Sequence, residues 1–236
     1  MVKLSVNVNK IATIRNARGG DIPNIVKATI KCQYYGADGI TVHPREDQRH
    51  ITYKDVYNIK EEVFKEYNIE GYPSKKFINM ILDVRPTQVT LVPDTADVIT
   101  SNSGWDTIKN NHFLKEVVSE FQANKIRTSI FVNPDIKIIQ EAKKIGTDRI
   151  ELYTGEYAEE FSKNKDKAIE RYILSAEVAK EINLGINAGH DLNLENLNFF
   201  VKKIKFLDEV SIGHALISDS LYFGLENTIQ MYKRLI

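Results

Sequence analysis

Short apolar runs recur along the chain, and each precedes a stretch whose apolar residues recur at helical spacing. A bounded apolar run is typical of a buried strand, and apolar residues three or four positions apart indicate an amphipathic helix. The pattern predicts eight strands, at residues 4–9, 39–43, 67–70, 88–92, 128–132, 149–153, 185–188 and 209–212. It predicts eight helices, at residues 21–36, 53–67, 74–84, 105–122, 134–146, 168–182, 194–206 and 221–236.

Strands that alternate with helices imply parallel pairing through right-handed crossovers. Eight such units in 236 residues predict a (β/α)8 TIM barrel, which typically takes about 250 residues. A doubly wound open sheet is the alternative, and it is less favoured because no Gly-x-Gly-x-x-Gly motif opens the first helix. No low-complexity segment or Gly/Ser linker interrupts the chain, so we expect a single TIM-barrel domain over residues 1–236.

Three connections show no helical period. Residues 10–20 form a basic loop with paired glycines, and residues 154–163 form a second polar loop. Residues 93–104 are rich in turn formers, and a connection of this length in a compact domain is often an active-site lid.

Composition narrows the class of protein. The 32 basic residues balance the 32 acidic residues, which argues against a general nucleic-acid binder and against a polybasic membrane protein. Cys32 is the only cysteine, so no intrachain disulfide can form and a reducing compartment is expected. The N-terminus has no signal-peptide core, and no stretch approaches the roughly 20 apolar residues of a membrane span. These features predict a soluble, cytoplasmic protein.

Polar residues gather where the predicted strands end. A TIM barrel carries its active site at the C-terminal ends of its strands, so these positions are candidates for catalysis. Four of the five histidines fall on this face, namely His43, His50, His190 and His214, whereas His112 lies within a predicted helix. The other polar residues at these ends are Asn7, Asn9, Glu70, Asp94, Asn133, Glu151 and Tyr153.

Acid–base catalysis is favoured at three of these positions. His43 precedes a charged segment and would be a general acid or base beside an anion site, whereas a solvated, salt-bridged loop is the alternative. His43 or His190 alone could be structural, but Glu70 on the same rim favours proton transfer. Glu70 could instead pair with an arginine of the loop at residues 15–18. For Glu151, an internal salt bridge and a substrate contact are equally open.

Two anion sites are also predicted. Gly189 and Gly213 follow the last two strands, where this fold commonly presents backbone N–H groups to phosphate. A second anion could be held by arginine side chains, and the candidates are Arg15, Arg18, Arg45 and Arg49. No metal-ligand spacing is present, so no metal is expected. Two anion sites with several proton shuttles suggest a condensation or rearrangement of phosphorylated sugars.

Two sequence blocks resemble a known family. Residues 7–19, NVNKIATIRNARG, and residues 36–51, GADGITVHPREDQRHI, are similar to the two signatures of the pyridoxine 5′-phosphate synthases. Shorter matches follow in order along the whole chain, at residues 68–70, 91–93, 151–157, 187–190 and 212–215.

The resemblance implies a reaction, an absence of cofactors and an assembly. The family condenses 3-amino-2-oxopropyl phosphate with 1-deoxy-D-xylulose 5-phosphate, and it releases phosphate and water as pyridoxine 5′-phosphate forms. No cofactor is implied. The family is oligomeric, as an octamer built from dimers.

The resemblance also implies roles for individual residues. His43 would be the first proton acceptor, Glu70 would shuttle protons in the dehydrations, and His190 would be the proton donor in the later steps. The residues implied to contact the amino ketone or its phosphate are Asn7, Arg18, Asp191, Gly213 and His214. The residues implied to hold the deoxyxylulose phosphate are Asn9, Lys10, Arg45, His50 and Thr100.

The chain departs from the family pattern at two places. Asn9 and Lys10 stand where the family has Asp-His, and Asp191 replaces the glycine that usually follows the histidine. These departures are the support for an alternative, a degenerate barrel that binds phosphorylated metabolites without turnover. A different phosphosugar aldolase or isomerase would need a metal or a Schiff-base lysine, for which Lys10 is the rim candidate.

Overall fold

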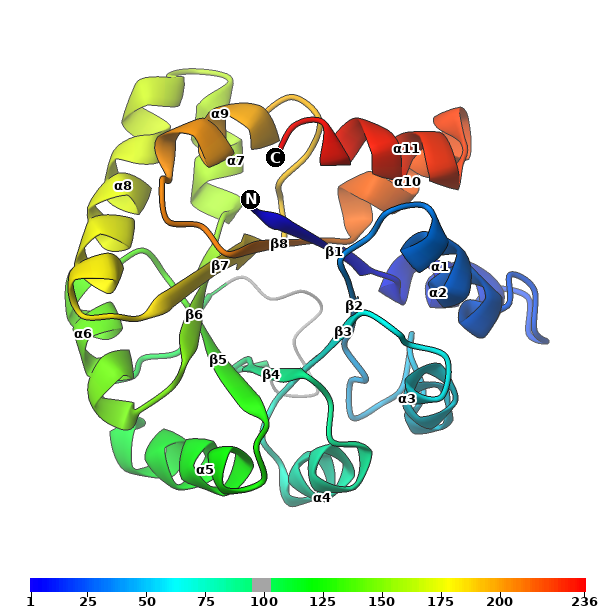
Figure 1. The fold of residues 1–236 in the computed structure, drawn as a ribbon, viewed down its shortest axis with the longest axis horizontal. Coiled ribbons are helices and arrows are strands. Elements are labelled where there is room, and N and C mark those ends of the chain that lie inside the picture. Colours follow the sequence, from blue (N-terminus) through cyan, green and yellow to red (C-terminus); the bar gives the residue numbers. More distant parts are fainter. Residues whose placement is uncertain (95–102) are drawn as a thin grey trace.

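Eight parallel strands close into a barrel in the computed structural model, which describes residues 1–94 and 103–236. Each strand pairs with its neighbours in chain order, and β1 also pairs with β8, so the barrel leaves no free edge. Figure 1 shows the helices arranged around this ring of strands. The predicted TIM barrel is confirmed. Its strands are β1 (Lys3–Asn7), β2 (Gly39–Val42), β3 (Glu66–Gly71), β4 (Gln88–Leu91), β5 (Arg127–Val132), β6 (Arg149–Tyr153), β7 (Gly185–Gly189) and β8 (Glu209–Ile212).

The helices pack their apolar faces against the outside of the barrel, and most of their buried residues are aliphatic. They are α1 (Asn9–Asn16), α2 (Ile25–Tyr34), α3 (Tyr53–Lys60), α4 (Lys75–Val84), α5 (Asn111–Ala123), α6 (Ile136–Ile145), α7 (Gly155–Phe161), α8 (Lys165–Glu181), α9 (Leu197–Lys203), α10 (His214–Phe223) and α11 (Leu225–Lys233).

Helix α1 occupies most of the segment for which a basic loop was predicted, so that prediction is wrong. Ile11, Ala12 and Arg15 lie on one face of α1 and are buried. The sequence pattern does not count an arginine as a buried helix position. The guanidinium of Arg15 is nevertheless buried, in a bidentate ion pair with Asp55 of α3 at 2.7 and 2.9 Å. This ion pair gives α1 its third buried position.

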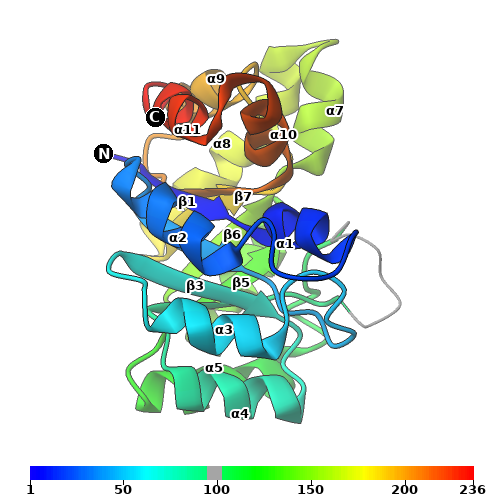
Figure 2. The same cartoon turned by 90° about the vertical axis from the view of Figure 1, so that its right-hand side faces the viewer.

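Helix α7 replaces a further stretch predicted as a loop. Helix α10 occupies residues 214–220, for which no element was predicted, and takes the first residues of the helix predicted at 221–236, which is therefore two helices. In α7, Tyr157 is fully buried and packs edge-on against Tyr172 and Phe200. In α10, Leu216 and Ile217 are buried, and Gly224 with φ of +77° separates this helix from α11. Figure 2 shows α1 and α7 towards the same end of the barrel.

Helix α3 ends at Lys60, earlier than its apolar spacing predicted. The side-chain oxygen of Gln33 accepts the backbone N–H groups of Phe64 and Lys65, at 2.8 and 3.0 Å. This side chain from α2 supplies acceptors that another turn of helix would have supplied, and the chain turns into β3.

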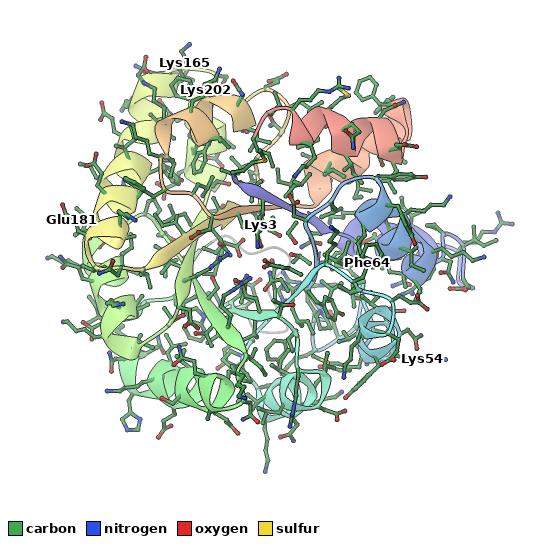
Figure 3. All side chains as sticks on the ribbon, viewed as in Figure 1. Lys3, Lys54, Phe64, Lys165, Glu181 and Lys202 are labelled. Carbon is green, nitrogen blue, oxygen red and sulfur yellow. The ribbon has the colours of Figure 1, made fainter. Side chains whose placement is uncertain are left out.

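The barrel interior is unusually polar. TIM barrels normally fill this space with branched apolar residues, but here Asn68, Gln88 and Asn187 are buried within it. Asn187 of β7 donates to Gln88 of β4 across the barrel at 3.4 Å, and Gln88 donates to Asn68 of β3 at 3.2 Å. In Figure 3, Lys3 lies over the centre of the ring, where it pairs with Glu66, whereas Lys54, Lys165 and Glu181 lie outside it.

Candidate active site

A cavity of about 360 Å³ opens at the C-terminal ends of the strands. Every strand, or the loop after it, contributes to its wall, as expected for this fold. The lining residues are Asn7, Asn9, Lys10, His43, Arg45, His50, Glu70, Val92, Phe131, Glu151, His190, Asp191, Ser211, Gly213 and His214.

Most of the predicted site residues meet in this cavity. Among them are the four histidines of the rim, whereas His112 is exposed on α5. Arg18 is exposed and does not line the cavity. Thr100, and most of the predicted lid with it, lies outside the described residues. Val92, Phe131 and Ser211 line the cavity but were not predicted; Ser211 shares a face of β8 with Glu209, a signal that strand alternation offers.

His43 and Glu70 form the centre of the site. His43 Nδ1 lies 3.9 Å from Glu70 Oε2, and the Asn7 side-chain amide donates to the same oxygen at 3.5 Å. Asn9 accepts the backbone N–H of His43 at 2.9 Å, which fixes the end of β2 relative to α1. The two titratable groups are therefore held side by side by the polar ends of β1 and α1.

Burial keeps both groups neutral at neutral pH. Desolvation, followed by repulsion from the Arg45 charge, lowers the pKa of His43 to about 3. Desolvation, followed by repulsion from the Asp94 carboxylate, raises the pKa of Glu70 to about 8. The 3.9 Å contact is then not an ion pair, because the imidazole is uncharged and the carboxyl group keeps its proton. The site offers one proton acceptor and one proton donor.

Glu151 is a third carboxyl group in the wall. Burial and the neighbouring Glu70 raise the pKa of Glu151 well above its usual value. Its Oε2 has no hydrogen-bond partner. Of the two alternatives for Glu151, the internal salt bridge is absent among the described residues, so the cavity wall contains a protonated carboxyl group without an ion-pair partner.

The arginines lie differently from the prediction. Arg15 pairs with Asp55 and Arg18 is exposed, so the alternative pairing of Glu70 with an arginine of residues 15–18 is wrong. Arg45 lines the cavity and pairs with Asp94 at 2.9 Å. Arg49 lies 3.6 Å from Asp47 and outside the cavity lining.

Two helix N-termini reach the cavity. Asn9 and Lys10 begin α1, and Gly213 and His214 begin α10. Backbone N–H groups at a helix start favour anions, and Lys10 adds a positive charge at one of them. Gly189 does not line the cavity, because its backbone packs closely on Ser211 and Glu151. Within residues 1–94 and 103–236, no group of histidine, cysteine or acidic residues could hold a metal ion.

The sequence from residue 4 to residue 236 matches the family model described as pyridoxal phosphate biosynthesis protein PdxJ. The chain belongs to this family. It is 57% identical to the pyridoxine 5′-phosphate synthase of Christiangramia forsetii, and the match covers 100% of both chains. It is 59% identical to the enzyme of the same name from Parabacteroides distasonis, over 99% of this chain and 98% of that one. The family predicted from the sequence blocks is confirmed, and the chain is an enzyme of vitamin B6 biosynthesis.

Solved structures with little sequence similarity share the fold. The N-(5′-phosphoribosyl)anthranilate isomerase of Pyrococcus furiosus superposes with a TM-score of 0.64 at 12% identity, over 100% of this chain and 98% of that one. The thiamine phosphate pyrophosphorylase of the same organism gives a TM-score of 0.64 at 11% identity, over 99% and 95% of the two chains. At this identity the likeness concerns the fold alone.

The departures of this PdxJ-family chain all lie in the cavity wall. Asn9 uses its side-chain oxygen on the backbone of His43, so a neutral amide serves there as an acceptor. Lys10 stands in the first turn of α1. Asp191 is paired with His190, since its Oδ2 lies 2.5 Å from His190 Nδ1.

Proposed function

We propose that the protein condenses 3-amino-2-oxopropyl phosphate with 1-deoxy-D-xylulose 5-phosphate to pyridoxine 5′-phosphate, phosphate and water. The observation that carries the proposal is that a neutral His43 lies beside a protonated Glu70 inside the cavity of about 360 Å³. Imine formation, dehydration and ring closure each need a proton to be removed at one atom and supplied at another. Groups whose pKa values are displaced in opposite directions can divide these tasks at one pH.

In this proposal the roles are those that the family resemblance implies. His43 accepts the first proton, Glu70 transfers protons during the dehydrations, and His190 supplies a proton in the later steps. Glu151 stands beside Glu70 as a further protonated group. No cofactor is proposed, because imine formation, the eliminations of water and phosphate and the aldol-type ring closure can all proceed by acid–base catalysis without an external oxidant or reductant.

The two phosphates would bind at neighbouring parts of the cavity wall, because α1 and α10 follow the adjacent strands β1 and β8. The start of α10, with Gly213 and His214, would hold the amino ketone phosphate together with Asn7. Asp191 would line that part of the cavity without contacting the phosphate through its carboxylate, which is paired with His190. The residues that would hold the deoxyxylulose phosphate are Asn9, Lys10, Arg45, His50 and Thr100. Arg18 is exposed, so its contact with the amino ketone would need a change of conformation or a second subunit.

The test is turnover of both substrates without added metal, with pyridoxine 5′-phosphate detected by fluorescence after chromatography. His43→Asn and Glu70→Gln should each lower kcat by about 10²- to 10⁴-fold, the usual contribution of a general acid or base. His112→Asn is the matched control, because His112 is exposed on α5, far from this chemistry. Near-normal turnover in both site variants would refute the roles.

The same assay separates the alternatives. A protein that binds both phosphates but forms no product would be the degenerate barrel. Loss of turnover in Lys10→Met, with a reducible adduct on Lys10 in the native protein, would indicate a Schiff-base aldolase.

We also propose that the protein is a cytoplasmic homo-oligomer, an octamer built from dimers. Large apolar side chains are exposed on α10, where Leu221 and Tyr222 are 70% and 85% exposed. Contiguous exposed apolar residues are typical of protein interfaces. No helix among residues 1–94 and 103–236 is long and apolar enough to cross a membrane. Light scattering on the purified protein would give its mass.

A further inference from the structure

The loop after β7 holds His190 in an uncommon backbone conformation. His190 has φ of +76°, in the left-handed region that residues other than glycine rarely adopt. Such a conformation persists only where the surrounding structure enforces it, and it is found mostly at functional sites.

Side chains from two neighbouring segments enforce it here. The Thr154 hydroxyl, which is fully buried, donates to the carbonyl of Gly189 and accepts the N–H of Asp191 at 3.3 Å. The Asn196 side chain donates to the carbonyl of Asp191 at 3.2 Å. The backbone is therefore fixed on both sides of His190.

The imidazole is held as well. Its Nδ1 lies 2.5 Å from Asp191 Oδ2, and its ring packs edge-on against Tyr153 with centroids 5.5 Å apart. An ionised carboxylate can only accept hydrogen bonds, so the proton in this contact belongs to Nδ1. Nε2 is then the ring nitrogen that remains for the cavity, which His190 lines.

We propose that Asp191 is a positioning residue that fixes the tautomer of His190, with the proton on Nδ1 and with Nε2 available to the substrate. The proposal rests on the proposed function, in which His190 exchanges protons with the substrate. Each such proton is bound and released at Nε2, while the Nδ1 proton stays on the carboxylate. The same bond gives the Asp191 carboxylate a partner in a cavity that receives phosphates.

The first test needs no turnover. In ¹⁵N-labelled, ligand-free protein at a pH where the imidazoles are neutral, the ring nitrogens of the five histidines are observed by NMR. His190 is assigned by the signals missing from His190→Gln. We expect the Nδ1–H tautomer in the native protein and a shift towards Nε2–H, which free imidazole side chains prefer, in Asp191→Ala.

A matched control removes a nearby carboxylate that does not contact His190. Glu156 of α7 pairs with Arg171 at the surface, so Glu156→Gln should leave the His190 signals unchanged. An Nε2–H tautomer in the native protein, or identical His190 signals in Asp191→Ala, would overturn the proposal.

The second test is kinetic. Asp191→Ala should lower kcat about tenfold or more and change KM for either substrate by less than about threefold. Because Asp191 acts through His190, the double variant Asp191→Ala/His190→Gln should be no slower than His190→Gln alone. A raised KM at unchanged kcat would instead place the carboxylate on the substrate. If the native enzyme makes no product, the proposed function fails, but the NMR result still decides the tautomer.

Discussion

At the scale of single residues, one physical cause acts on His43 and Glu70 in opposite directions. Burial disfavours the charged form of any group, so it weakens the histidine as a base and weakens the glutamic acid as an acid. Their distance of 3.9 Å would suit an ion pair on a surface. In this cavity the neutral forms prevail, and one acceptor and one donor stand side by side near neutral pH.

These displaced pKa values predict how folding stability depends on pH. The lowered pKa of His43 makes a contribution that is present above about pH 6.5 and is lost as the pH falls towards 3. Because the pKa of Glu70 is raised, its burial contributes folding stability that is fully present below about pH 4.5 and is lost as the pH rises through 8. The free energy of unfolding in urea, measured from pH 4 to 9, should therefore depend less on pH on the acid side in His43→Asn. In Glu70→Gln it should depend less on pH on the alkaline side.

The controls for this profile are an exposed pair of the same residue types. His112 and Glu116 lie 3.6 Å apart on α5, with side chains 91% and 68% exposed. His112→Asn and Glu116→Gln should leave the profile within error, since surface pairs contribute little. An unchanged profile in both site variants would show that His43 and Glu70 titrate normally.

Sequence could predict which residues meet in the site but not how they pair. His43, Glu70 and His190 were found because they end strands, and strand ends of a barrel share one face. The partner of Arg15 was mistaken because α1 was unrecognised, and Asp55 is 40 residues away along the chain. The bond from His190 to Asp191 depends on a left-handed backbone at His190, which no local pattern of residue types specifies.

At the scale of elements, the Arg15–Asp55 pair joins α1 to α3 and holds the loop between β2 and α3. Arg15 also donates to the carbonyl of His50 at 3.3 Å, so one buried guanidinium reaches a residue of the cavity wall. Asp55 belongs to the capping box of α3 with Thr52. A single ion pair thus joins the last turn of α1 to the first turn of α3 and contributes to the position of His50.

Removing one member of this pair should be strongly destabilising. Asp55→Ala leaves a buried charge unpaired, and we expect a loss of about 3–5 kcal/mol in the free energy of unfolding. The apolar double variant Arg15→Met/Asp55→Leu should recover much of that loss, because neither charge is then buried. Urea unfolding measures both effects.

The same variants can be tested for substrate binding through KM, and an exposed ion pair provides the control. The double variant removes the bond from Arg15 to His50, so KM for the deoxyxylulose phosphate should rise modestly in it. Asn16 still donates to the same carbonyl at 2.8 Å, and Thr13 still contacts the His50 ring at 3.1 Å. Glu156→Gln breaks the exposed pair with Arg171 and should cost less than about 1 kcal/mol. If Asp55→Ala also lowered the free energy of unfolding by less than about 1 kcal/mol, the buried pair would not stabilise the loop between β2 and α3.

Strands were easier to predict than helices in this chain. Each strand core is a short apolar run, and all eight were located within a few residues. Helices α1 and α7 were missed because their buried faces are short. Each includes a residue with a polar group, Arg15 or Tyr157, so the apolar spacing of a helix is incomplete. Helix α3 was overextended because the acceptors that end it come from Gln33, on another helix.

At the scale of the whole molecule, the barrel is closed by its ends. Lys3 to Val6 of β1 pair with Glu209 to Ile212 of β8, and α11 contacts α2. Figure 1 shows the two termini on the same side of the ring. The sequence predicted this closure only by counting units, because the pairing of β1 with β8 spans nearly the full chain.

Closure by the chain ends predicts one cooperative unit over residues 1–236. Neither half of the barrel has a complete core, since β1 and β8 each lose a partner when the halves separate. Trp105, the only tryptophan, lies in the segment after β4 and reports on one half by fluorescence, whereas far-UV circular dichroism reports on all helices. We expect both signals to change in a single, coincident urea transition at fixed protein concentration. Two separate transitions would show that the halves fold as independent domains, and they would contradict the single-domain organisation.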